Sequence, residues 1–139
     1  MRAEDLTVQQ PDPVAGPART SARDLPGWDP TNPMYTAWAS AFRRRKHSAP
    51  KEGKTFTITQ AQAWDIINKQ GWKCALTGVP FTSGGGRSDT QPSMDRINSS
   101  LGYEPGNVQF LTLRVNYCKR ELSDAAFVQL CKQVAGYKK

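Results

Sequence analysis

The sequence predicts an α+β domain, because helical and strand-like spacing occupy different parts of one short chain. Apolar residues follow helical intervals over 33–42, 60–70 and 123–134, whereas side chains alternate between two faces over 94–97 and 107–110. At 139 residues the chain has the length of one ordinary domain. We therefore expect one small α+β core with flanking helices.

The amino-terminal part divides into a tail and a basic helix. Residues 1–31 are polar, contain five prolines and show no apolar period, so we expect a flexible tail that orders only against a partner. In residues 32–55, Asn32 suits an N-cap and Pro33 the first helical position. The segment 48–55 is expected to be a linker. The predicted helix runs into four consecutive cations and a histidine: Arg43, Arg44, Arg45, Lys46 and His47.

These cations have two readings: they clamp a phosphate backbone, or they form a solvated helix end whose charge suits the helix dipole. The formal net charge of +7 and the pI of about 9.6 favour a polyanionic partner. The alternative is a soluble protein whose basic charge has no role in binding. The sequence has no stretch of roughly 20 apolar residues and no secretion signal. Three cysteines without a C-x-x-C pair indicate free thiols in a reducing compartment, so we expect a cytoplasmic protein without a membrane partner.

The segment 56–139 is expected to form the remaining domain. Thr59 and Gln62 have capping-box spacing ahead of a helix over about 60–70, and Gly71 supplies its stop. Residues 72–81 predict a strand or tight hairpin with a turn near Gly78, and 83–91 a flexible loop. The final helix begins after Ser123, is expected to pack on the core without chemistry of its own, and stops at Gly136.

The central stretch predicts strand, wide turn, strand and helix, in that order. Such a unit can bring Asp95, from the first strand, near Asn116, from the helix. Carboxylate and amide oxygens are hard donors that suit Mg²⁺ together with water and a substrate phosphate. The alternatives are an ordinary ion pair between Asp95 and the adjacent Arg96, and an asparagine that caps backbone.

Four segments in order resemble the HNH endonuclease superfamily, and most of all its phage-type branch. They are CALTG at 74–78, PSMDRINSSLGYEPGNVQFL at 92–111, RVNYCK at 114–119 and LSDAAFVQLC at 122–131. The resemblance implies a small ββα-metal core with flanking helices and, for a phage-encoded protein, a location in the host cytoplasm. The cysteine pairs of many zinc-bearing members are reduced here to Cys74, so we expect no structural zinc and assign its role to apolar packing.

The resemblance also implies roles for single residues. Asp95 and Asn116 match the ligands of a divalent cation, Mg²⁺ or Mn²⁺, and Asn107 matches the amide that supports the loop and orients the general base. Arg96 stands where cleaving members carry the histidine base. An arginine, with a pKa above about 12, cannot accept a proton near neutral pH, although it can bind phosphate. The proton would then pass to water on the metal, to a substrate phosphate or to His47.

Three classes of function follow from these observations. The first is a metal-dependent endonuclease that cuts double-stranded DNA slowly or only nicks it, with Asp95, Arg96, Asn107 and Asn116 as its catalytic set. The second is a non-cleaving relative that binds DNA, or binds a host or phage protein through its tail. A virion or packaging component is the third, and RNA is a less favoured ligand than DNA. In either of the first two classes the expected phosphate-binding residues are Arg43, Arg44, Arg45, Lys46, Arg96, Lys119 and Arg120.

Overall fold

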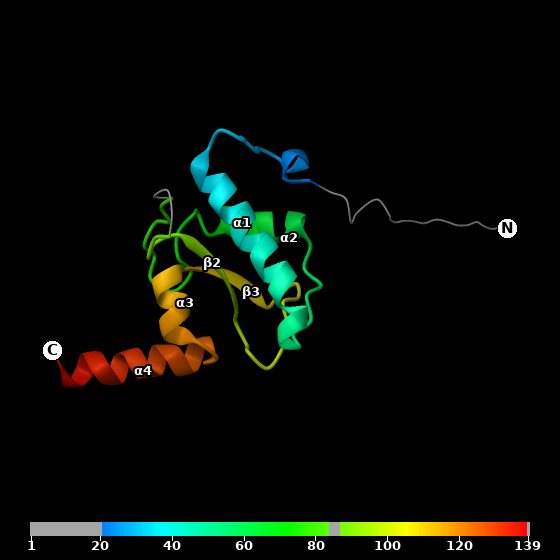
Figure 1. Ribbon diagram of the computed structural model, residues 1–139. Helices are drawn as coiled ribbons and strands as arrows, with labels where there is room; N and C mark the ends of the chain where they lie inside the picture. The colour runs from blue at the N-terminus through cyan, green and yellow to red at the C-terminus, as the bar shows by residue number, and fades with distance from the viewer. Residues whose placement is uncertain (1–20, 84–86, 139) are drawn as a thin grey trace.

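The computed structural model describes residues 21–83 and 87–138. Residues 1–20 of the predicted tail and 84–86 of the predicted loop lie outside this part of the chain. Four α-helices and one antiparallel pair of strands make up its main elements and form the α+β fold that the sequence predicts (Figure 1). In chain order the elements are η3 (Ala22–Asp24), α1 (Pro33–Ser48), η4 (Pro50–Glu52), α2 (Gln60–Lys69), β2 (Pro92–Arg96), β3 (Val108–Thr112), α3 (Leu113–Lys119) and α4 (Asp124–Tyr137).

The two-stranded sheet sets which side chains face the core and which face the site. Met94 of β2 lies opposite Phe110 of β3, and Asp95 lies opposite Gln109. Because successive side chains in a strand point to opposite faces, Met94 and Phe110 pack toward α1 while Asp95 and Gln109 point toward α3. The predicted ribbon is confirmed, although its strands begin at Pro92 and Val108 instead of 94 and 107.

The predicted starts of the first two long helices are confirmed by their caps. The Asn32 side chain accepts a hydrogen bond from the Met34 amide at 2.9 Å, and α1 continues through the whole basic run. At α2, Thr59 and Gln62 form both hydrogen bonds of the capping box. The chain leaves that helix through Gly71 at a φ of +68°. A side chain is disfavoured in this left-handed conformation, which explains the glycine.

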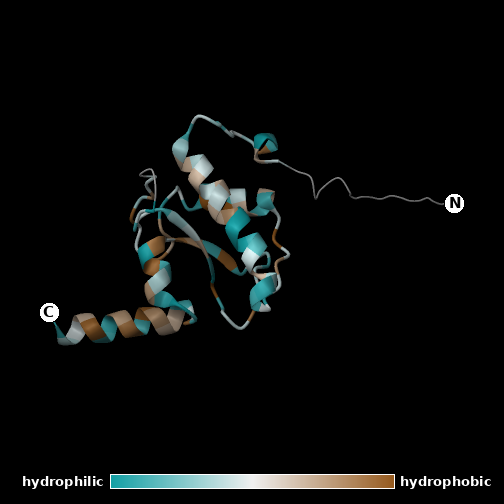
Figure 2. Cartoon of the chain, viewed as in Figure 1, coloured by the Kyte–Doolittle hydropathy of each residue, from teal (hydrophilic) through white to brown (hydrophobic). Residues whose placement is uncertain are grey.

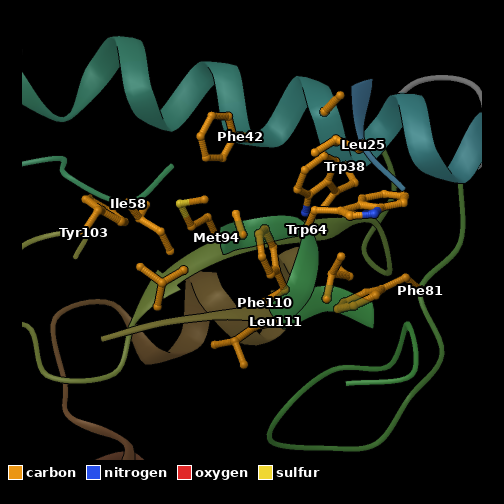
Figure 3. Packing of buried hydrophobic residues seen from close by; sticks show 14 of the residues in the cluster. Leu25, Trp38, Phe42, Ile58, Trp64, Phe81, Met94, Tyr103, Phe110 and Leu111 are labelled. Carbon is orange, nitrogen blue, oxygen red and sulfur yellow. The ribbon is translucent and has the colours of Figure 1, made fainter. Parts of the chain in front are cut away.

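One aromatic core joins α1, α2 and the sheet (Figure 3). Trp38 of α1 lies with its ring centroid 5.1 Å from that of Trp64 on α2 and 6.2 Å from that of Phe110 on β3. Phe42, one helical turn beyond Trp38, is also buried. The basic helix at 32–48 is therefore a wall of the same core as the ribbon, not a separate unit.

The expectation of a flexible tail up to residue 31 is wrong for residues 21–31. Leu25 is buried, and the Trp28 ring lies 5.5 Å from that of Trp64. The Trp64 indole also donates a hydrogen bond to the Pro26 carbonyl at 2.8 Å. Two large apolar side chains among prolines have no period to detect, yet they bury enough surface to hold this segment on the core.

The predicted packing of the last helix on the core is also wrong. Its Ser123 cap is confirmed, with the hydroxyl accepting from the Ala126 amide at 3.2 Å. However, none of the residues Asp124–Tyr137 is buried, and α4 extends away from the domain (Figure 1). The helix also continues through Gly136, so this glycine is not its stop. The face that it exposes carries several apolar residues (Figure 2).

Of the two alternatives predicted for 72–81, a strand or a tight hairpin, the structure shows the tight hairpin. Lys73 and Pro80 make one isolated antiparallel bridge, and Gly78 occupies the turn at a φ of +72°. Within residues 21–83 and 87–138, no helix is both long and apolar enough to cross a membrane.

Candidate functional site

A cationic groove lies where α1, β2 and α3 meet. It has a volume of about 620 Å³, and both Asp95 and Asn116 line it. Its other acidic residue is Glu121. Six cationic side chains share the lining with these groups: Arg44, Arg45, Lys54, Arg87, Arg96 and Arg120. Such an excess of positive charge in a concave surface attracts polyanions.

Asp95 presents one carboxylate oxygen to the interior and the other to the groove. Oδ2 accepts hydrogen bonds from Lys119 Nζ at 2.8 Å and from Gln109 Nε2 at 3.0 Å. Burial raises the pKa of Asp95, while the hydrogen bonds from Lys119 and Gln109 oppose that rise. Oδ1 accepts no hydrogen bond from the described residues. Among these residues, Trp38 Nε1 is the only fully buried side-chain polar atom that lacks a partner, so Asp95 Oδ1 is not fully buried. Oδ1 therefore reaches the surface of the groove.

Lys119 binds Asp95 from the interior of the protein and does not line the groove. Its side chain is fully buried, with Nζ 2.9 Å from the Arg96 carbonyl and 3.3 Å from Asp124 Oδ1. The expectation that Lys119 binds phosphate is therefore wrong, because its ammonium is enclosed by protein. Two carboxylates and one ammonium leave this cluster with one net negative charge.

Asn116 is fixed so that its carbonyl oxygen is the free end of the amide. The amide contacts the Met94 carbonyl at 3.1 Å and the Ser93 hydroxyl at 2.7 Å. A backbone carbonyl only accepts hydrogen bonds, so the atom that faces it must be Nδ2. Met94 directly precedes Asp95, so α3 brings Asn116 against the strand that carries Asp95, and both residues line the groove, as the predicted strand–turn–strand–helix order allows.

The donor set fits a divalent cation that also binds substrate. Among residues 21–83 and 87–138, no group of three or more His, Cys, Asp or Glu side chains could hold a metal ion. The oxygens of Asp95 and Asn116 that the described hydrogen bonds leave free would supply two ligands, and the adjacent cluster of Asp95, Asp124 and Lys119 carries one net negative charge. Mg²⁺ commonly keeps several waters and binds through one or two carboxylates together with substrate phosphate. This arrangement suits an ion that binds tightly only when a phosphate supplies further oxygens.

Asn107 supports the loop between the strands. Its Nδ2 donates to the carbonyls of Asn98 and Gly102 at 3.0 and 2.8 Å, and its Oδ1 accepts from the Asn98 amide at 2.9 Å. All these partners are loop backbone. The structure thus gives this residue the loop contacts that the resemblance implies, and its contacts include no candidate base.

Arg96 is also committed to that loop. Its side chain is 9% exposed, and it donates to the carbonyls of Ser99 and Leu101 at 2.7 and 3.0 Å. A third bond reaches Glu121 at 2.9 Å, and the guanidinium carbon lies 5.5 Å from the Tyr103 ring centroid. Three of its five N–H groups therefore already have protein acceptors, which limits what Arg96 can offer to a phosphate.

The basic run of α1 does not act as one surface. Residues in a helix are turned by about 100° each, so four neighbours cannot face the same way. Arg44 and Arg45 line the groove, whereas Arg43 and Lys46 line a second cavity of about 760 Å³ beside Phe56. His47 lines neither of these cavities; its imidazole lies 2.9 Å from the ammonium of Lys51.

Four groove residues were not singled out from the sequence: Lys54, Arg87, Tyr117 and Glu121. The Arg87 guanidinium lies 5.3 Å from the Tyr117 ring centroid, and Tyr117 is 55% exposed. Each is an isolated residue in a segment expected to be a linker, a loop or a helix surface. Only the spatial meeting of these segments marks them, so no local sequence signal could have found them.

Comparisons with known proteins support the fold. No protein-family model matches the sequence, and no curated protein matches it. The solved structure of PacI, a rare-cutting HNH restriction endonuclease that perturbs DNA, is similar in fold to this chain, with a TM-score of 0.51. The match has 19% sequence identity and covers 85% of this chain and 87% of that chain. The chain therefore has an α+β fold similar to that of an HNH restriction endonuclease.

Proposed function

We propose that this protein is a metal-dependent endonuclease that hydrolyses phosphodiester bonds of double-stranded DNA. One observation carries the proposal: the open oxygens of Asp95 and Asn116 line the same cationic groove. The similarity in fold to an HNH restriction endonuclease supports this reading. A phage origin, a cytoplasmic location and a protein partner for the tail remain predictions.

The groove residues would share the work of binding and orientation. Asp95 and Asn116 would hold Mg²⁺ or Mn²⁺, which stabilises the leaving oxygen and polarises water in phosphodiester hydrolysis. Lys119 and Gln109 fix the inner oxygen of Asp95, so that its outer oxygen stays directed into the groove. The exposed cations Arg44 and Arg120 would bind the flanking phosphates.

Proton removal from the attacking water is the step that the groove residues are expected to assist least. Arg96 cannot accept a proton, and His47 lines neither cavity. Glu121 is the other groove carboxylate, but Arg96 and Lys54 engage it at 2.9 and 3.7 Å. Loss of a positioned general base typically costs about 10²- to 10⁴-fold in rate. We therefore expect slow cleavage that appears first as nicking.

The decisive experiment follows supercoiled plasmid in Mg²⁺, Mn²⁺ or EDTA, with wild type, Asp95→Asn and Arg96→His. We expect metal-dependent nicking that falls at least about 100-fold in Asp95→Asn, because the metal loses its one charged ligand. Arg96→His should nick faster than wild type if it stays folded, which circular dichroism checks, since Arg96 also holds the loop. The matched control is Asp65→Asn on α2, which replaces an exposed carboxylate remote from the groove lining and should leave nicking unchanged.

The alternative, a non-cleaving DNA-binding protein, is favoured by one observation: an arginine tied to the loop occupies the base position. Fluorescence anisotropy of labelled duplex, measured beside the nicking assay, separates the two. Salt-sensitive binding without nicking by wild type or Arg96→His would establish the binder and reject the nuclease. Nicking that persists equally in Asp95→Asn and EDTA would point to a contaminating activity and also reject the proposal.

A further inference from the structure

Glu121 is an exposed carboxylate that lies among the cations of the groove. It belongs to the turn between α3 and α4, and its backbone carbonyl accepts a hydrogen bond from the Ser99 hydroxyl. The turn is thereby held against the loop between the strands, while the Glu121 side chain is 71% exposed. One carboxylate oxygen lies 2.9 Å from Arg96 Nη2, and the other lies 3.7 Å from Lys54 Nζ. A single negative group therefore bridges two cations that come from separate segments of the chain.

We propose that Lys54 and Arg96 form a subsite for one backbone phosphate of DNA, and that Glu121 fills this subsite until DNA displaces it. This inference rests on DNA as the proposed ligand of the groove, but it does not depend on cleavage. A carboxylate and a phosphodiester each present two oxygens that share one negative charge, and the same cations recognise both. The bridge made by Glu121 thus has the charge and the pair of acceptors that a bound phosphate would have.

Arg96 is held in place by contacts that do not involve Glu121. Its Nη1 donates to the carbonyls of Ser99 and Leu101, and its guanidinium lies against the Tyr103 ring. The bond to Glu121 comes from Nη2, so displacement of that side chain frees an N–H group without releasing the guanidinium from the loop. A donor that is already held in position loses little conformational entropy when a phosphate replaces the carboxylate.

The contacts of Glu121 are weak enough for a phosphate to replace them. An ion pair whose carboxylate is mostly in solvent contributes little to stability, and the distance of 3.7 Å to Lys54 is too long for a hydrogen bond. Lys54 also keeps a partner when Glu121 leaves, because Glu52 Oε1 lies 3.1 Å from its ammonium. Duplex DNA presents many phosphates at once, so its combined attraction to the groove exceeds that of one mobile side chain.

The test compares duplex binding by wild type and Glu121→Gln in fluorescence anisotropy titrations with EDTA, which prevents cleavage. The glutamine has nearly the same size and can still accept a hydrogen bond from Arg96, but it carries no charge to compete with phosphate. We expect the variant to bind at least about threefold more tightly at low salt. Asp65→Asn is the matched control, since Asp65 is also exposed and ion-paired but does not line the groove. It should bind like wild type, and both variants should keep the circular dichroism of wild type.

Salt dependence separates displacement of Glu121 from a general change of charge. When a phosphate displaces Glu121, the released carboxylate takes up a cation from solution, and this uptake offsets part of the counterion release from DNA. Glu121→Gln has no such uptake, so its negative slope of log K against log salt concentration should be steeper by up to about 0.9. Asp65→Asn should leave the slope unchanged.

A Lys54→Gln background tests the subsite itself. Without the Lys54 charge, Glu121 has one cation fewer to hold, so Glu121→Gln should raise the affinity by a smaller factor than it does in the wild-type background. An equal gain in both backgrounds would mean that Glu121 acts only through long-range repulsion, and would overturn the subsite.

Three further outcomes would overturn the inference. The first is binding by Glu121→Gln that is no tighter than that of wild type, because Glu121 would then only hold the turn in place. The second is a gain that Asp65→Asn matches, and the third is the absence of duplex binding by wild type and Glu121→Gln alike. Nicking by wild type without tighter binding by Glu121→Gln rejects this inference and keeps the nuclease, whereas tighter binding without nicking does the reverse.

Discussion

At the scale of single residues, the site rests on a buried lysine rather than on an exposed one. Lys119 was expected to meet phosphate, but it neutralises Asp95 and Asp124 inside the protein. The ammonium thereby makes it possible to keep a carboxylate 95% buried at the base of a groove, because an unpaired buried charge is very costly. Lys119 is thus a positioning residue for Asp95.

Lys119→Met should strongly destabilise the fold, because it leaves the buried carboxylate without its cation. We expect the free energy of unfolding to fall by about 3 to 5 kcal/mol, measured by urea denaturation. Lys132→Met on the exposed helix is the control, and should change the free energy of unfolding by less than about 0.5 kcal/mol. Equal losses in the two variants would mean that the ion pair with Asp95 does not stabilise the protein.

At the scale of elements, the rotation of α1 divides one run of cations between two faces. A run of four charges looks like a single patch in the sequence, yet only Arg44 and Arg45 reach the groove. Arg45 is in turn engaged by Glu52 at 3.0 Å and by the Tyr103 hydroxyl at 3.1 Å. Among the four cations of the run, Arg44 is therefore the one whose guanidinium is most available to bind a phosphate in the groove.

Arg44→Ala should weaken DNA binding more than Arg43→Ala. Arg43 is the adjacent residue of α1, but it lines the second cavity instead of the groove. If Arg44 contacts one phosphate, its loss should make the negative slope of log K against log salt concentration shallower by about 0.9. Arg43→Ala changes the net charge by the same amount and should alter this slope far less. Anisotropy titrations of a duplex at several salt concentrations measure both. Equal slopes for the two variants would place the DNA outside the groove.

At the scale of the whole molecule, the segment 21–31, α1, α2 and the sheet close one aromatic core, while α4 stays outside it. This closure fixes the groove, because its walls come from α1 on one side and from β2 and α3 on the other. The segment before α1 therefore contributes to the shape of the site without touching it.

Trp28→Ala should destabilise the whole domain, although Trp28 lies in a proline-rich stretch. Its ring packs against those of Tyr35 and Trp64, so its loss should lower the free energy of unfolding by about 2 to 4 kcal/mol in urea denaturation. Pro30→Ala, an exposed change in the same stretch, should cost less than about 1 kcal/mol. A Trp28→Ala protein as stable as Pro30→Ala would show that this segment does not belong to the core.

Elements whose signals lie within a few neighbouring residues could be predicted from the sequence. The Asn32 and Thr59 caps, the turn at Gly78 and the alternation around Asp95 each follow from a few neighbouring residues, because capping, turn geometry and strand pleating act over one or two turns of chain. The order of those elements was also enough to bring Asp95 and Asn116 to one place.

Which charged side chains line the groove, and which apolar side chains are buried in the core, follows from how distant segments pack together. Lys119 is buried and Arg44 is open because of what packs around them, and Lys54, Arg87 and Glu121 meet at the groove from separate segments. The same holds for Leu25, which is buried, and for Leu130, which is not. Burial depends on contacts between residues far apart in the chain, and such contacts leave no local pattern to detect.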